Sequence, residues 1–253
     1  MINLYSSQEI KKIALAGKIL AKVLKILKKE AKIGTSLRDL DKLAYQLIHK
    51  YKAKPAFLGY RPDGALKPFG GSICASINDV VVHGLPSDYK LQNGDVLKID
   101  LGVEYQGYFS DAAITIGIGK ISKEAKRLVE ATESALKKSI KAARAGKTLA
   151  DISLAIEKTA RERGFEIIAG LTGHGIGKEL HEEPTIYNYY RQSDVKIKLE
   201  PGMVLAIEPM FALKTGQIKQ LTDESWATAD GSLSSHFEHT IAITKGGPII
   251  LTK

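Results

Sequence analysis

Apolar residues recur at steps of three and four along four stretches of the chain, a pattern typical of amphipathic helices. The first apolar stripe, with lysines on the faces beside it, consists of Ile10, Ile13, Gly17, Leu20, Leu24 and Leu27. Each stretch begins after residues that favour a helix start, namely Ser6 or Ser7, Thr35 or Ser36, Ser122, and Thr148 with Asp151. With glycine or proline as breakers, the pattern predicts helices over 6–34, 35–55, 122–146 and 148–164.

Between the two helix pairs, the apolar pattern becomes that of β-strands. Residues 72–82 predict a strand pair, and residues 94–115 predict two longer buried strands joined by a turn. Asp100 and Asp111 interrupt the apolar runs of these longer strands. An ionised carboxylate in an apolar strand is costly unless it is paired or binds a metal. The two side chains are therefore predicted to converge on a cation.

Segments of the first half of the chain recur in the second half. GTSLRDL aligns with GKTLADI, GDVLKID with GMVLAIE, and SDAAIT more loosely with FEHTIAIT. These alignments pair Asp100 with Glu208 and Asp111 with Glu238. A duplication of this kind predicts one pseudo-two-fold domain over residues 1–253, with halves of about 6–121 and 122–253.

His174, in the glycine-rich segment 172–177, adds one imidazole to the four carboxylates. Oxygen-rich ligation with a single imidazole suits divalent Mn, Co, Fe or Zn. Five ligands exceed what one catalytic ion needs if it keeps an open position. Two ions that share bridging carboxylates use all five ligands and activate a bridging hydroxide near neutral pH. The predicted chemistry is metal-assisted hydrolysis.

Several short motifs give the chain a resemblance to a known family. They are VVHGLP at His83, IDLG at Asp100, FSDAA at Asp111, GHGIG at His174, LHEEP at His181, IEPM at Glu208 and FEHT at Glu238. In these motifs and their order, over nearly the whole chain, the sequence resembles the type I methionine aminopeptidases. The resemblance implies the α+β pita-bread fold, a pseudo-two-fold central antiparallel sheet with helices on its outer face. It also implies removal of the N-terminal methionine from nascent polypeptides when the second residue is small.

The resemblance further implies a role for each polar site residue. Two divalent ions (Co, Mn, Fe or Zn) would be held by Asp100, Asp111, His174, Glu208 and Glu238. Asp111 and Glu238 would bridge both ions, and Glu208 would also handle the proton of the attacking hydroxide. His83 would hydrogen-bond to the scissile amide nitrogen or to the residue after it. His181 would stabilise the carbonyl oxygen as it gains charge, and the free amino group of the substrate would ligate a metal.

The resemblance assigns the methionine pocket to Tyr60, Phe69, Cys74, Leu180 and Trp226, with Phe57 as a further candidate. Soft, polarizable contacts of this kind suit a thioether. Cys74 is predicted to be a pocket wall and not a nucleophile, since no base with a third orienting group is evident. Two features depart from the family pattern: segment 61–71 is longer, and Leu180 stands where an aromatic residue is usual.

Composition bears on the compartment and on charged partners. A single cysteine excludes an internal disulfide, and no apolar run approaches the roughly 18 residues of a membrane span. The N-terminus also lacks the order of a signal peptide, so we expect a cytoplasmic protein without membrane contact, and a monomer. The net charge is +9. A lysine-rich solvated surface explains most of it, while the lysine-rich first helix also suits salt-sensitive ribosome binding, without specific DNA binding.

Two other functions remain open at this point. One is a related pita-bread peptidase acting on Xaa-Pro bonds, although such proteins usually carry a further N-terminal domain. The other is a non-catalytic protein that binds ribosomes or RNA, although such relatives lose ligands and this chain keeps all five. GHGIGK lacks the spacing of a phosphate-binding loop, and HEEPT lacks the second histidine of a zincin motif.

Overall fold

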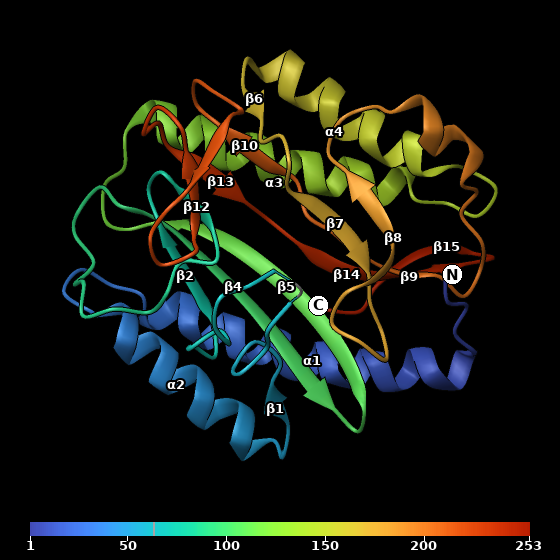
Figure 1. Cartoon of the computed structure of the whole chain (residues 1–253), viewed down its shortest axis with the longest axis horizontal. Helices are drawn as coiled ribbons and strands as arrows, with labels where there is room; N and C mark the ends of the chain where they lie inside the picture. Colours follow the sequence, from blue (N-terminus) through green and yellow to red (C-terminus); the bar gives the residue numbers. More distant parts are fainter. Residues whose placement is uncertain (63) are drawn as a thin grey trace.

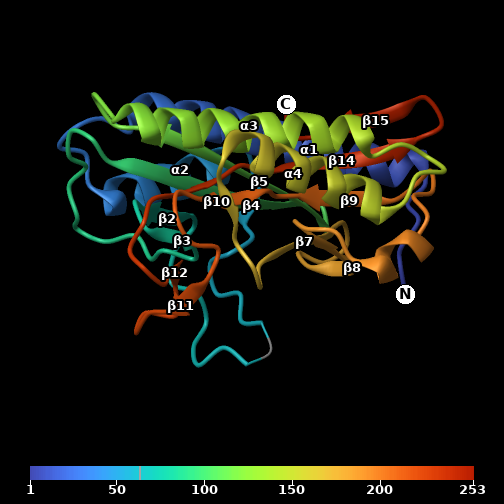
Figure 2. The ribbon, with the colours of Figure 1, turned by 90° about the horizontal axis from the view of Figure 1, so that it is seen from above.

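The four predicted helices form and lie together on one face of the protein (Figures 1 and 2). The computed structural model describes residues 1–62 and 64–253. The helices are α1 (Ser7–Glu30), α2 (Leu37–Lys50), α3 (Lys123–Ala142) and α4 (Leu149–Arg163). Their N-caps are among the residues that the sequence indicates, namely Ser6, Ser36, Ser122 and Thr148.

The first three helices stop several residues before the predicted breakers. The amide of Gly34 donates to the carbonyl of Leu91 at 2.8 Å, and that of Gly146 donates to Leu199 at 2.9 Å. These glycines therefore belong to connecting turns with partners of their own, which end the helices early. Gly164 caps α4 in the left-handed conformation, as predicted. Across the described residues, no helix has both the length and the apolar character needed to cross a membrane.

The hairpin with the two interrupting carboxylates forms the centre of the first sheet. β4 (Val96–Tyr105) pairs antiparallel with β5 (Tyr108–Gly117) around a turn at Gln106 and Gly107, both at positive φ. β4 also pairs with β2 (Cys74–Ile77) and with the short β1 (Lys54–Pro55). Apolar side chains of α1 and α2 share one core cluster with those of β4. The predicted pair of long buried strands is confirmed.

The second half builds a larger antiparallel sheet beside its own helix pair. The strand order is β15-β14-β9-β7-β8. The strands are β7 (Thr172–Gly175), β8 (Glu182–Tyr187), β9 (Val204–Ile207), β14 (His239–Thr244) and β15 (Gly247–Ile250). Apolar residues of α3 and α4 form a second core cluster with β9 and β14. Each half thus pairs two helices with one sheet, as the internal repeat predicts.

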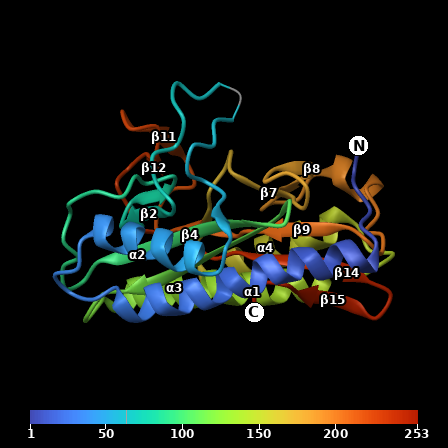
Figure 3. The same ribbon diagram turned by 90° about the horizontal axis from the view of Figure 1, so that it is seen from below.

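Two small sheets and a 3₁₀ helix complete the described elements. One sheet has the order β13-β10-β6, formed by β6 (Glu166–Ile167), β10 (Met210–Ala212) and β13 (Ser234–His236). The other has the order β11-β12-β3, formed by β3 (Val80–Val82), β11 (Ile218–Gln220) and β12 (Trp226–Thr228). The 3₁₀ helix is η1 (Gln192–Lys196). β3, β11 and β12 lie on the side of the protein away from the helices (Figures 2 and 3).

The two large sheets meet where β5 runs beside the start of β14. The Asp111 amide donates to Thr240 Oγ1 at 2.9 Å, and the Thr240 hydroxyl donates to the Asp111 carbonyl at 2.7 Å. The Glu238 amide donates to the Ala113 carbonyl at 2.9 Å. These bonds join the halves at the residues that carry the paired carboxylates. The predicted α+β fold with a pseudo-two-fold is confirmed, while the division near residue 121 stays a prediction.

Candidate active site

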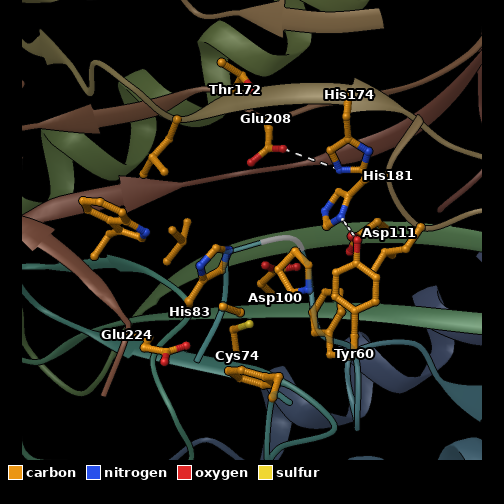
Figure 4. Close-up of a pocket in the computed structure, with 18 of the residues that line it drawn as sticks. Tyr60, Cys74, His83, Asp100, Asp111, Thr172, His174, His181, Glu208 and Glu224 are labelled. Carbon is orange, nitrogen blue, oxygen red and sulfur yellow. Dashed lines mark hydrogen bonds and ion pairs between the residues drawn. The ribbon is translucent and has the colours of Figure 1, made fainter. Parts of the chain in front are cut away.

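Both halves of the chain line a cavity of about 1310 Å³, part of which Figure 4 shows. Its wall contains every polar residue that the sequence analysis assigns to the site: His83, Asp100, Asp111, His174, His181, Glu208 and Glu238. It also contains the pocket candidates Tyr60, Phe69, Cys74, Leu180 and Trp226. The structure therefore brings the whole candidate set to one place.

Strand register fixes where the carboxylates lie. Asp100 sits inside β4 opposite Cys74 of β2, and Asp111 sits inside β5 opposite Gly102. Glu208 follows β9, and Glu238 lies directly before β14. β4, β9 and β14 each pair with strands on both sides, and β5 pairs with β4 along its whole length. Their backbone hydrogen bonds therefore hold the carboxylates with little freedom.

Three of the side chains come close enough to share one cation. A ligand atom from each of Asp111, His174 and Glu238 lies within 4.8 Å of the other two. Asp100 Oδ1, Asp111 Oδ1 and Glu238 Oε1 are buried and lack a hydrogen-bond partner among the described residues. Buried oxygens without partners are costly in a neutral site and are typical of a centre that binds a cation. The residues present therefore fit a divalent metal.

The protonation behaviour of the cluster points the same way. Burial, followed by mutual repulsion, raises the pKa of Asp100, Glu208 and Glu238 well above the usual range, and burial also raises that of Asp111. A cation among them would offset both the lost hydration and the repulsion. Without one, the four carboxyl groups retain protons that free carboxyl groups would have lost.

His174 is prepared to act as a neutral ligand. Its Nδ1 lies 2.8 Å from the carbonyl oxygen of Gly175, so that Nδ1 carries the proton and Nε2 keeps its lone pair. Nε2 lies 3.7 Å from Glu208 Oε1. Burial lowers the pKa of His174 to about 4. The imidazole is therefore uncharged at neutral pH and free to coordinate.

His181 and His83 face the same cavity from opposite halves (Figure 4). The His181 ring stands edge-on to His174, with centroids 4.4 Å apart, and its Nδ1 lies 2.8 Å from the Tyr60 hydroxyl. Loss of hydration, followed by the neighbouring histidines, lowers the pKa of His181 to about 3. Loss of hydration also lowers the pKa of His83. Both rings are neutral at pH 7 and can donate one hydrogen bond each.

His236, which is not among the predicted site residues, also reaches the cluster. Its side chain is 1% exposed, and its Nε2 lies 3.4 Å from Glu208 Oε2. Burial lowers the pKa of His236 to about 3, so this contact joins a neutral ring to the carboxyl group. In an extended chain, residues two positions apart point their side chains the same way. The step from His236 to Glu238 is therefore the sequence signal that could have placed His236 in the site.

The apolar part of the cavity supplies a pocket beside the carboxylates. Phe57 and Phe69 meet edge-to-face with ring centroids 6.4 Å apart, and Leu180 and Cys74 are buried in the same cluster. Trp226 lies on β12, paired with Val82. Burial, followed by the nearby carboxylates, raises the pKa of the Cys74 thiol well above its usual range. A neutral thiol is a poor nucleophile, which agrees with the prediction that Cys74 forms part of the pocket wall and does not attack the substrate.

Segment 61–71, which the sequence predicts to be longer than in the family, forms part of the cavity wall. Its Leu66 amide donates to Glu224 Oε1 at 3.2 Å, which ties the segment to the turn between β11 and β12. Pro62, Gly64, Leu66 and Pro68 line the cavity, while residue 63 lies outside the described residues. The segment therefore adds to the walls of the site, and the pocket candidate Phe69 lines the same cavity.

The fold and the acidic centre together define a metal-dependent hydrolase, and comparisons with known proteins agree. The chain belongs to metallopeptidase family M24, whose model matches residues 11–245. Relatives that match over nearly the full length of both chains include methionine aminopeptidases. It is 46% identical to that of Aquifex aeolicus (strain VF5), with 100% of this chain and 99% of the relative covered.

Solved structures give the same grouping. The crystal structure of methionine aminopeptidase from Thermotoga maritima matches with a TM-score of 0.94 at 39% identity, and each chain is covered completely. The prolidase of Pyrococcus horikoshii OT3 matches with a TM-score of 0.76 at 28% identity. That match covers 99% of this chain but 63% of the prolidase. The pita-bread fold and the use of a divalent metal, both predicted from the sequence, are confirmed.

Proposed function

We propose that this metallopeptidase removes the N-terminal methionine from nascent polypeptides whose second residue is small. The observation that carries the proposal is one cavity in which two buried and two partly buried carboxylates and a neutral imidazole adjoin a pocket of aromatic rings, leucine and a thiol. The acidic centre suits hydrolysis, and the soft pocket suits a thioether. Full-length similarity to methionine aminopeptidases supports the same substrate.

We propose two divalent ions, with Co, Mn, Fe and Zn as candidates. Asp111 and Glu238 would be shared, Asp100 would bind one ion, and His174 and Glu208 would bind the other. When bound, such ions polarise the peptide carbonyl and activate a water molecule near neutral pH. The number of protein ligands supports a pair, because a single catalytic ion needs fewer and keeps a position open.

Glu208 is proposed to take the proton that the attacking water releases. Its two oxygens lie 3.7 Å from His174 Nε2 and 3.4 Å from His236 Nε2. Burial, followed by Asp111, raises the pKa of Glu208, which makes the carboxylate a stronger base. One oxygen can hold the proton and pass it to the departing amine nitrogen.

His181 and His83 are proposed to orient the peptide bond. If the Tyr60 hydroxyl donates to His181 Nδ1, the remaining proton of that neutral ring is on Nε2. Nε2 can then donate to the carbonyl oxygen as negative charge develops. His83 enters the cavity from the other half and is assigned to the scissile nitrogen or to the next residue of the substrate.

The setting of the enzyme is also a proposal. The single, buried Cys74 suits a reducing compartment, and we propose a cytoplasmic monomer. α1 lies on the side of the protein away from β11 and β12 (Figure 2), and its exposed lysines include Lys11, Lys18, Lys22, Lys25 and Lys29. Docking this face on a ribosome would leave the cavity open. We expect co-sedimentation with ribosomes to weaken as salt rises, and binding that is insensitive to salt would count against this contact.

The proposed substrate is tested with purified, reduced protein and two peptide series. We expect release of methionine from Met-Ala-Ser when Co or Mn is added, and none from the metal-free protein. A Met-Leu-Ser peptide is expected to be cut poorly. Preferential cleavage of Xaa-Pro peptides would instead support the activity that the prolidase likeness suggests. Failure with every divalent ion would contradict the proposal.

A further inference from the structure

The turn between β7 and β8 carries His181 on the cavity wall, so contacts that fix this turn also fix His181. Segment 176–181 connects the two strands; Lys178 and Glu179 are exposed, and His181 is open to the cavity. One backbone bond joins the turn to the first half, from the Phe109 amide to the Gly177 carbonyl at 2.7 Å. Further support for this turn comes from the N-terminal segment, which lies beside β8 in Figures 2 and 3.

The ring of Tyr5 fills a space that Gly177 leaves open. Tyr5 is 6% exposed, and its amide donates to the carbonyl of Gly202 at 2.8 Å. A Cβ atom at Gly177 would lie 2.3 Å from the Tyr5 ring and hydroxyl. The glycine is therefore required by the close approach of the ring, since real Cβ atoms do not come so near. The position of Tyr5 is therefore fixed by its backbone bond to Gly202 and by its ring packed against Gly177, in addition to the contacts of its hydroxyl.

The hydroxyl of Tyr5 then organises the turn. It donates to the Glu182 carboxylate, 2.6 Å from Oε1 and 2.8 Å from Oε2, and accepts from the Lys178 amide at 3.0 Å. Glu182 Oε1 also accepts from the amides of Lys178 and Glu179 at 2.8 and 2.9 Å. Burial, followed by the hydrogen bond to Glu182, raises the pKa of Tyr5, so it stays protonated through the neutral range.

We propose that Tyr5 is a positioning residue for the peptidase reaction, which fixes His181 through Glu182. Glu182 follows His181 directly, so a carboxylate clamped by the phenol and two amides sets the backbone from which the imidazole projects. The inference rests on the proposed function, because His181 is assigned there to the carbonyl oxygen. Small displacements of an orienting group reduce turnover strongly, which makes the clamp relevant to catalysis.

Tyr5→Phe tests the hydroxyl alone, because the ring can remain against Gly177. We expect kcat for Met-Ala-Ser to fall about tenfold while KM changes less than about twofold. Tyr45→Phe, at an exposed tyrosine of α2, is the matched control and should leave both constants unchanged. An inactive wild-type enzyme would refute the proposed function, whereas an active enzyme with an unchanged Tyr5→Phe variant would refute only the role of Tyr5.

A double-mutant cycle separates positioning from general stability. If Tyr5 acts through His181, Tyr5→Phe should have almost no effect on kcat in a His181→Ala background. Additive losses would contradict the inference. Hydrogen exchange of the metal-free protein gives a readout without activity: the Lys178 and Glu179 amides should exchange faster in Tyr5→Phe than in wild type. Equal protection of these amides would also overturn it.

Discussion

At the scale of single residues, Glu208 has two assignments that one substitution can separate. It lies among the candidate metal ligands and also contacts the neutral rings of His174 and His236. Glu208→Gln keeps a coordinating oxygen but loses the basic carboxylate. We expect kcat to fall by about 10²- to 10⁴-fold with most of the bound metal retained, as measured by kinetics together with metal analysis.

The matched control for this substitution is Glu200→Gln, at an exposed position before β9. It should leave turnover and metal content unchanged. Glu208→Gln with near wild-type turnover would remove the proton-transfer role, and loss of the metal would assign Glu208 to ligation instead.

The residue types of the site could largely be predicted from the sequence, because an acidic group inside an apolar strand needs a specific reason. Asp100 and Asp111 stand out in this way, and all five candidate ligands line the cavity. His236 has only its two-residue step from Glu238 as a local signal, because its contact with Glu208 joins two separate segments of the sequence. The hydrogen bond from Tyr5 to Glu182 could not be predicted for the same reason, because it links residues 177 positions apart.

At the scale of elements, the helix starts follow local chemistry and can be tested one at a time. Ser6 caps α1 in a reciprocal box: its side chain accepts from the Glu9 amide, and the Glu9 carboxylate accepts from the Ser6 amide at 2.9 Å. We expect Ser6→Ala to lower the free energy of unfolding by about 1 kcal/mol in urea denaturation. Ser7→Ala, one residue inside the helix, should cost less than about 0.5 kcal/mol, and equal losses would contradict the cap assignment.

Helix ends and strand pairing were less predictable than helix starts. Gly34 and Gly146 mark turns whose partners, Leu91 and Leu199, lie far along the chain, so the local pattern overextends the helices. The short strands β11 and β12 have no distinct apolar alternation, and they form because β12 pairs with β3.

At the scale of the whole molecule, the two halves meet at a centre that is costly without a cation. Burial and repulsion raise the pKa of its carboxyl groups, so the metal-free fold holds protons that the unfolded chain loses above about pH 4. Those groups must lose their protons to bind a metal, so metal affinity should rise with pH. His174 does not oppose this trend, since its pKa of about 4 leaves it neutral throughout.

We therefore expect the stabilisation by a fixed concentration of Mn to grow between about pH 6 and pH 7.5. The increase should be about 1.4 kcal/mol per pH unit for each proton displaced. The measurement is urea unfolding with and without Mn. The difference between the two free energies of unfolding cancels the contributions of titratable groups that metal binding does not affect. Asp111→Asn should reduce the stabilisation and its slope, and a stabilisation that falls with rising pH would contradict the account.

The most direct measurement is anomalous X-ray scattering from crystals grown with Mn. We expect strong peaks among the side chains of Asp100, Asp111, His174, Glu208 and Glu238, at the junction of the two sheets. Peaks elsewhere on the protein, with these five side chains free of metal at saturating Mn, would contradict it.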